Sequence, residues 1–374
     1  MKKSTVVWVL CLTASIALLA GCGKKEEEPE VVEETPVAEV VVQESADATP
    51  VYTGPVSYLT GLPIDEKYEN YRPVAVMIPN DEKSAMPQLG LSQAGVIYEA
   101  LVEGYGTRLM AIFDYAELED LEKVGPVRST RLYFAYFSTQ WDCIICHYGQ
   151  AIYASQYMNS DAIDNLTGLR YVEENIVYYK DSDRPSANND FTSGERILDG
   201  IEYYEYRTEH FKDFEPSFTF ASDEVVLDHT SGVVTANVVK PGFAVNKPYF
   251  VYNDEDGLYY RYQYGDEHID GNTGDILTCK NIIIQICRTE TLDEKGYLYV
   301  ETEETGSGYY ITNGKAIPIF WENDGQYLPT TYVDENGNEI ELNPGTTWIC
   351  VVDYDYANKI EFLEKEETTS ETDD

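Results

Sequence analysis

The sequence predicts an α+β fold in which a mixed α/β N-terminal domain precedes an antiparallel, β-rich C-terminal domain. Residues 72–207 mix short apolar runs with segments of helical spacing, whereas turn signals of β-hairpins recur after residue 218. The composition includes 32 Tyr, a residue that favours the half-buried surfaces of sheets. The length of 374 residues suits two domains plus tails, at about 150 residues per domain.

The N-terminal half alternates predicted strands and helices. Gly104-Tyr105-Gly106 separates two apolar runs as the turn of a hairpin would, although the first run could also be helical. Thr192-Ser193-Gly194-Glu195 has the composition of a helix start. The predicted strands are residues 73–78, 96–102, 108–113 and 142–148, and the predicted helices are 127–140, 151–158 and 192–204.

The C-terminal half is predicted to contain strands joined by tight turns. The turn signals are Asp256-Gly257, Asn313-Gly314 and Asn336-Gly337, which tolerate the positive φ angles of hairpin turns. Because side chains alternate along a strand, we expect Tyr260, Tyr262 and Tyr264 to share one face. That face could pack within the sheet or present aromatic rings to a glycan or a protein.

The N-terminus has the features of an export signal and a lipid anchor. Lys2 and Lys3 precede an apolar run over residues 6–19, which is too short to span a bilayer and fits a signal-peptide core. The run ends in Leu19-Ala20-Gly21-Cys22, which resembles the bacterial lipobox. This resemblance implies that residues 1–21 are removed and that Cys22 is acylated. The predicted location is the extracytoplasmic face of the cell membrane, with membrane lipid as a partner through Cys22.

Acidic segments flank the predicted domains. Residues 24–50 hold nine acidic residues and two lysines, so residues 22–57 are predicted to be a disordered tether, and residues 361–374 a similar tail. The two domains then occupy residues 58–212 and 213–360. The net charge of −41 excludes a nucleic-acid partner, because a phosphate backbone would be repelled.

Several motifs occur in the order found in the YerB-like bacterial lipoproteins, which this chain resembles over most of residues 58–353. The resemblance implies an N-terminal and a C-terminal domain, both of unknown function, after a lipobox, and it implies no established activity. The motifs are Leu59-Thr60-Gly61-Leu62-Pro63, residues 72–78, Tyr98-Glu99, Val102-Glu103-Gly104, Thr107-Arg108, residues 125–129 with Arg131, His147, His268-Ile269-Asp270, Asn281-Ile282-Ile283 and residues 342–349.

An arginine cluster is the main candidate for a ligand-binding site. Arg108, Arg128 and Arg131 fall within 24 residues in a strongly acidic chain, and Gly125-Pro126 precedes the predicted helix start that carries Arg128 and Arg131. Backbone N–H groups at a helix start, together with guanidinium groups, would hold an anion. The structural alternative is that these arginines pair with Glu99 and Glu103. The sequence therefore predicts a non-catalytic protein that binds a cell-envelope polymer or a partner protein.

The alternative function is an extracytoplasmic hydrolase acting on a cell-envelope polymer. Glu99 and Glu103 would lie about 13 Å apart on a strand, or about 6 Å apart on a helix. Glycoside hydrolysis needs carboxyl groups about 5–9.5 Å apart, so only the helix would suit it. His147 with Ser129 could form a base and a nucleophile. The sequence contains no nucleophile elbow, phosphate-binding loop or zinc-protease motif.

The cysteines are predicted to be small buried hydrophobic residues. Cys143-Ile144-Ile145-Cys146-His147 matches the spacing of a haem attachment site, but a strand would direct the two thiols to opposite faces. We therefore expect neither a cofactor nor a metal ion. The other three cysteines of the predicted domains are Cys279, Cys287 and Cys350, and an odd total leaves at least one thiol unpaired.

Overall fold

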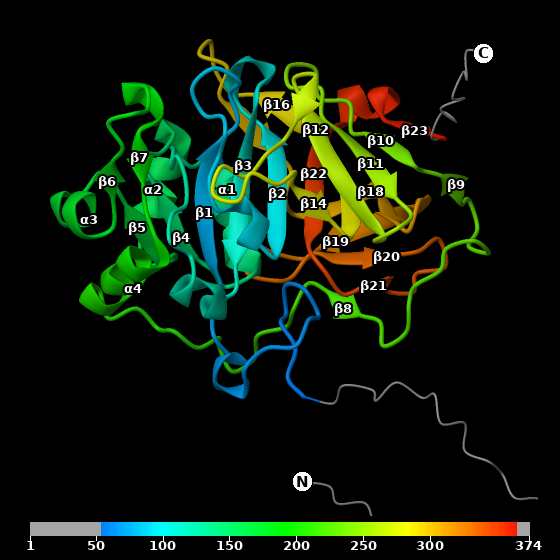
Figure 1. The fold of residues 1–374 in the computed structure, drawn as a ribbon, viewed down its shortest axis with the longest axis horizontal. Coiled ribbons are helices and arrows are strands. Elements are labelled where there is room, and N and C mark those ends of the chain that lie inside the picture. The colour runs from blue at the N-terminus through cyan, green and yellow to red at the C-terminus, as the bar shows by residue number, and fades with distance from the viewer. Residues whose placement is uncertain (1–53, 365–374) are drawn as a thin grey trace, which may run out of the picture. The chain divides into compact units, whose positions relative to one another are not determined.

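A computed structural model describes residues 54–364 of the chain. The predicted signal peptide, Cys22, nearly all of the tether and most of the tail lie outside these described residues. Within them the fold is α+β, as predicted, and is built on one large mixed sheet (Figure 1). In spatial order its strands are β20 (Thr331–Val333), β19 (Lys315–Asn323), β18 (Glu304–Thr312), β15 (Asn281–Cys287), β22 (Thr347–Asp353), β2 (Val96–Leu101), β3 (Thr107–Phe113), β1 (Val74–Pro79), β4 (Ile144–His147) and β5 (Asn165–Thr167), with β9 (Val234–Thr235) beside β19.

Strands from both halves of the sequence meet in this sheet. β22 pairs in parallel with β2 and with β15, so Trp348 lies opposite Ile97 on one side and Ile282 on the other. The strands β15, β22, β2, β1, β4 and β5 therefore run in one direction. We call the edge where these strands end the carboxyl edge, and the edge where they begin the amino edge. The boundary between the predicted domains stays a prediction, because both ranges contribute to one sheet.

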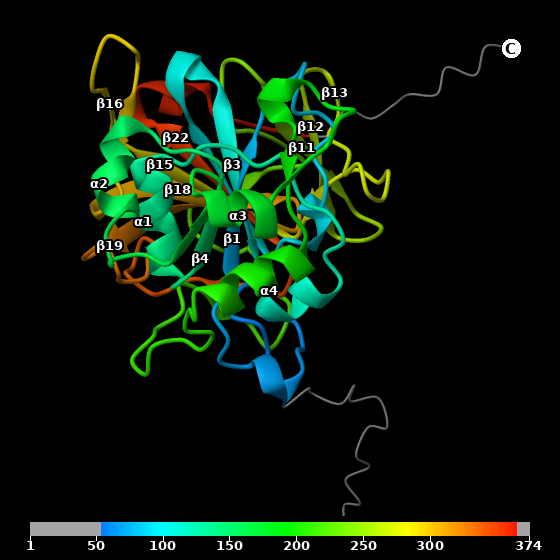
Figure 2. The same cartoon turned by 90° about the vertical axis from the view of Figure 1, so that its left-hand side faces the viewer.

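The large sheet is covered on both faces. Val76 of β1 packs in one core cluster with Ile197 of α4, whereas Met77 packs in the other with Phe137 of α1. Figure 2 shows α1 and α2 to the left of β1 and β4, and β11 and β12 to their right. Burial on both faces explains why β1 is a continuous apolar run. The helices are α1 (Leu132–Gln140), α2 (Ser155–Met158), α3 (Tyr171–Ile176) and α4 (Gly194–Tyr203).

A smaller sheet packs against the large one. In its strand β12, Tyr259 and Arg261 are buried while Tyr260 and Tyr262 are half-buried, which confirms the predicted alternation for these two tyrosines. Tyr264 lies beyond the end of β12 with a φ angle of 57°, and its hydroxyl donates to the Asn80 carbonyl, so the alternation does not extend to it. The ring of Tyr262 stacks on Tyr249 at 4.8 Å between centroids, so part of this face packs within the sheet. The strands are β13 (Asp266–Glu267), β12 (Leu258–Gln263), β11 (Tyr249–Asn253), β10 (Val238–Lys240) and β23 (Glu361–Leu363), with β14 (Thr278–Cys279) beside β12.

The predicted turns form where expected. Asn313 and Gly314 have φ angles of 49° and 71° and join β18 to β19. Asp256 and Gly257 lie between the antiparallel strands β11 and β12. Three short strand pairs complete the described fold: β16 (Thr289–Thr291) with β17 (Leu298–Val300), β21 (Glu341–Leu342) with β8 (Thr219–Phe220), and β6 (Tyr179–Lys180) with β7 (Asp190–Phe191).

One predicted helix is shorter than its apolar spacing suggests. The helix expected over residues 127–140 begins at Leu132. The backbone N–H of Val127 donates to the Asp190 carbonyl, and that of Arg128 donates to the Met77 carbonyl. These hydrogen bonds hold the segment extended beside neighbouring backbone, so the prediction of a helix there was wrong. Within residues 54–364, no helix is long and apolar enough to cross a bilayer.

Candidate functional site

The carboxyl edge brings together most of the side chains in the predicted ligand site. Arg108, at the start of β3, lies opposite Pro79 of β1 and Ala100 of β2. Glu103 lies in the short connection between β2 and β3. Ser129 and Arg131 belong to the extended segment before α1, and the carbonyl of Ser129 accepts hydrogen bonds from both Arg108 and Arg131.

Arg131 is saturated by partners in the protein. Its Nε and Nη2 atoms donate to the two carboxylate oxygens of Glu103, and its Nη1 atom donates to the carbonyls of Ser129 and Thr130. Burial alone would raise the pKa of Glu103, but the hydrogen bonds and charge of Arg131 hold that pKa below its usual value. This pair fits the structural alternative for Arg131.

Arg108 and Arg128 differ from Arg131 because neither pairs with a carboxylate within residues 54–364. Arg128 donates to the carbonyl of Ala187. The Nε atom of Arg108 is buried and has no hydrogen-bond partner among these residues. Burial, together with the nearby charges of Arg131 and Arg128, lowers the pKa of Arg108 to about 9. An anion between these two side chains would compensate their charge.

Glu99 lies in a separate, fully buried network. Its Oε2 atom accepts a hydrogen bond from Arg261 Nη2 at 2.7 Å. Its Oε1 atom accepts hydrogen bonds from Thr107 Oγ1 at 2.9 Å and from Asn246 Nδ2 at 2.6 Å. Glu99 thus pairs with an arginine from the second half of the chain rather than with the cluster. The sequence feature that could have revealed Arg261 is its position between Tyr260 and Tyr262 on a predicted strand, which places its charged side chain on the opposite face from these two rings.

His147 and Ser129 do not form a nucleophile and a base. The Nδ1 atom of His147 lies 2.7 Å from the Gly149 carbonyl, and its Nε2 atom lies 3.2 Å from Asn165 Oδ1. The Ser129 hydroxyl donates to the Tyr148 carbonyl. Burial lowers the pKa of His147 to about 4, so the imidazole is neutral at pH 7. Both ring nitrogens are therefore occupied within the protein.

The five cysteines of the described chain are buried and free. Cys143 and Cys146 pack in different core clusters, as expected for two thiols on opposite faces of a strand. Burial raises the pKa of both thiols, which disfavours the reactive thiolate. Among residues 54–364, no three His, Cys, Asp or Glu side chains are grouped so that they could hold a metal ion.

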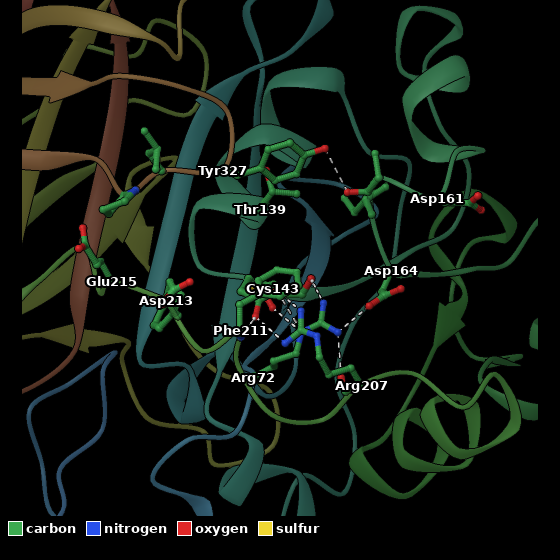
Figure 3. Close-up of a pocket in the computed structure, with 16 residues that line it drawn as sticks. Arg72, Thr139, Cys143, Asp161, Asp164, Arg207, Phe211, Asp213, Glu215 and Tyr327 are labelled. Atoms are coloured by element: carbon green, nitrogen blue, oxygen red, sulfur yellow. Dashed lines mark hydrogen bonds and ion pairs between the residues drawn. The ribbon is translucent and has the colours of Figure 1, made fainter. Parts of the chain in front are cut away.

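A cavity of about 570 Å³ opens at the amino edge (Figure 3). Arg72 lies two residues before β1, Cys143 directly precedes β4, and Asp164 directly precedes β5, so strand starts supply one wall. The sequence did not indicate Arg72 or Asp164 as site residues, because each occurs singly beside an apolar run, and Cys143 was expected to be a buried hydrophobic residue. The other lining residues are Thr139, Asp142, Asp161, Ala162, Ile163, Arg207, Phe211, Asp213, Phe214, Glu215, Tyr327, Leu328 and Pro329.

Comparisons with known proteins show the family of this chain. Residues 59–207 match the family described as "Protein of unknown function (DUF3048) N-terminal domain", and residues 239–349 match its C-terminal domain. The chain belongs to this family of two-part proteins, which confirms the resemblance to YerB-like proteins.

A named relative and a solved structure extend this assignment. The chain is 29% identical over 359 residues to "Putative lipoprotein YerB" of Bacillus subtilis (strain 168), and the match covers 94% of this chain and 96% of that protein. The crystal structure of the YerB protein from Bacillus subtilis aligns with a TM-score of 0.71 and 28% identity, and covers 83% of this chain and 99% of that chain. The α+β fold is therefore shared with this relative.

Proposed function

We propose that this chain is a lipid-anchored, extracytoplasmic protein that binds a ligand without catalysing a reaction. Two observations support the anchor: the lipobox-like Leu19-Ala20-Gly21-Cys22 after an apolar run, and the name "Putative lipoprotein YerB" of a relative matched over nearly its full length. Acyl chains on Cys22 would insert into the membrane and leave the folded residues outside the cell.

The anchor is tested by labelling cells with an alkyne analogue of palmitate. The unaltered chain should carry the label and remain with the membrane fraction. A Cys22→Ser chain should lose both properties, while a Cys11→Ser chain, altered inside the predicted signal, should keep them. Equal labelling of the Cys22→Ser chain would contradict the proposal.

The ligand proposed for the carboxyl edge is an anionic group of a cell-envelope polymer or of a partner protein. The observation that carries this proposal is that Arg108 and Arg128 have no carboxylate partner among the described residues, and that Arg108 Nε is buried without an acceptor. Arginine favours anions because its planar guanidinium group can donate several hydrogen bonds.

Binding is tested with inorganic phosphate, a small anion, as the probe and with the full-length chain in nanodiscs of phosphatidylcholine. Arg128→Gln and Arg108→Gln should each weaken binding about tenfold, because a hydrogen bond to a charged group contributes roughly 1.5 kcal/mol. Lys212→Gln removes the same charge from an exposed position and is the matched control. Equal effects of all three changes would contradict an anion site at the carboxyl edge. Thermal unfolding of each variant separates lost binding from lost folding.

The alternative, a hydrolase, has less support from the geometry. Glu99 is fully buried and paired with Arg261, and both ring nitrogens of His147 have protein partners. A catalytic acid or base must reach a proton on the substrate, which these side chains do not do in this arrangement. Release of reducing ends from purified cell walls by the full-length chain, abolished by Glu103→Gln, would favour the hydrolase instead.

A further inference from the structure

One wall of the amino-edge cavity contains two arginines, Arg72 and Arg207, whose guanidinium groups donate to partners within the protein. Arg207 donates from both terminal nitrogens to the Asp142 carboxylate, at 2.8 and 2.6 Å. Arg72 donates from Nε to the Asp142 carbonyl and from Nη1 to Asp164 Oδ2. Figure 3 shows these groups meeting on one side of the cavity, with Tyr327 on the other. Both guanidinium groups are engaged, so this wall offers no free cation to an anionic ligand.

Three carboxylates around the cavity have no ion-pair partner among the described residues. Asp161, Asp213 and Glu215 line the cavity, and all three are exposed. No side chain within residues 54–364 forms a hydrogen bond or an ion pair with them. They come from two segments that are more than fifty residues apart in the sequence, so the tertiary structure places them around one opening. The charge available to a ligand here is therefore negative.

Large apolar side chains are also exposed around this cavity. Phe211, Tyr327 and Leu328 are 60%, 55% and 49% exposed. The guanidinium of Arg207 lies 3.7 Å from the centroid of the Phe211 ring and occupies one of its faces. The Tyr327 ring has no cation stacked on it among the described residues, and it belongs to a different segment from Phe211. Covering such rings with an apolar ligand would remove them from water.

We propose that this cavity binds a basic peptide segment in which a Lys or Arg side chain lies beside an apolar residue. The positive side chain lies beside Asp213 and Glu215 and against the face of Tyr327, and the apolar residue contacts Leu328. Asp161 lies on the opposite side of the cavity (Figure 3). The cavity volume lies within the usual range of ligand sites, about 300–1,000 Å³. The net charge of −41 raises the local concentration of basic peptides near the chain. This site is separate from the anion site proposed at the carboxyl edge.

The proposal is tested by isothermal titration of the full-length chain in phosphatidylcholine nanodiscs with the peptide acetyl-Leu-Lys-Leu-amide. Two matched peptides carry norleucine or glutamate in place of the lysine. We expect the lysine peptide to bind at least tenfold more tightly than the norleucine peptide, with an affinity that falls as salt is added. Binding of the norleucine or glutamate peptide with equal affinity would overturn the proposal, as would no binding of the lysine peptide.

Variants locate the binding in the cavity. Asp213→Asn and Glu215→Gln should each weaken binding of the lysine peptide about two- to fivefold, as expected for exposed ion pairs. Tyr327→Ala should weaken it by a similar factor. Glu335→Gln is the matched control, because it removes the same charge from an exposed residue that does not line the cavity. The proposal is overturned if these three changes weaken binding no more than Glu335→Gln does.

Discussion

Arg261 Nη2 lies 2.7 Å from Glu99 Oε2, and neither side chain has any exposed surface. Glu99 belongs to β2 of the large sheet and Arg261 to β12 of the smaller one, so this ion pair joins the two sheets across the core. The Arg261 guanidinium also lies 4.3 Å from the ring centroid of Trp348. The pair therefore links both halves of the sequence at the centre of the molecule.

We predict that Glu99→Ala destabilises the protein by about 3–5 kcal/mol, because it leaves the charge of Arg261 buried without a partner. The control is Glu361→Ala, which breaks the exposed pair between Lys240 and Glu361 and should cost less than about 1 kcal/mol. Urea unfolding followed by circular dichroism measures both free energies of unfolding. Similar costs for the two changes would contradict a structural role for the buried pair.

The stability contributed by His147 should fall as the pH is lowered from about 6.5 to about 4. The folded-state pKa of His147 is lowered to about 4, whereas an unfolded histidine titrates near 6.5, so in this window the unfolded chain binds a proton that the folded chain does not. The contribution of His147 reaches about 3 kcal/mol and levels off below pH 4. His268 and His210, whose pKa values are also lowered, add to the slope.

The His147 contribution is isolated by urea unfolding of a His147→Gln variant across this pH range. Its free energy of unfolding should change less steeply with pH than that of the unaltered chain, whatever the cost of the substitution at pH 7. His229→Gln, at an exposed position, is the matched control. An unchanged slope in the His147→Gln variant would show that the imidazole is not kept neutral in the folded state.

Gly194 should not tolerate a side chain. A Cβ atom at this first residue of α4 would lie 1.8 Å from the carbonyl oxygen of Leu118, so the helix would have to shift. We expect Gly194→Ala to lower the free energy of unfolding by about 1–3 kcal/mol. Gly106→Ala is the control, because nothing lies within 4 Å of a Cβ there. The comparison uses urea unfolding, and equal stability of the two variants would mean that α4 can move away from Leu118.

The five buried cysteines should be unreactive in the folded protein. Cys143, Cys146, Cys279, Cys287 and Cys350 are buried, so Ellman's reagent should label them only after unfolding. On the acylated chain, five thiols should then become available in guanidinium chloride. Rapid labelling without denaturant would show that one of these strands opens readily.

Local patterns were sufficient to predict several strands and the hairpin turns of this fold. The apolar run at Val74–Pro79 forms β1, and Asn313-Gly314 forms a hairpin turn, because both depend on residues that are adjacent in the chain. The helix expected from residue 127 begins only at Leu132, because hydrogen bonds from Val127 and Arg128 to distant backbone override the apolar spacing. Spacing alone does not reveal a distant hydrogen-bond partner.

The sequence predicted correctly only some of the residues that lie together in the candidate ligand site. Proximity in the chain suggested that Arg108 and Arg131 lie together, and their shared contact with the Ser129 carbonyl shows that they do. Proximity also suggested that Glu99 belongs with them, but its partner is Arg261, which lies in another sheet. Whether the remaining members of the cluster bind a ligand stays a prediction.

The sequence by itself determined the family, the α+β class and the strongly acidic character of this protein, because motifs, periodicity and charge are properties of the chain. The tertiary structure decided which charges are compensated. Glu99 and Arg261 neutralise each other in the core, whereas Asp213 and Glu215 have no ion-pair partner in the described chain, beside a cavity built from distant segments. The physical reason is that the free energy of a charge depends on its burial and its neighbours, and both are set by packing.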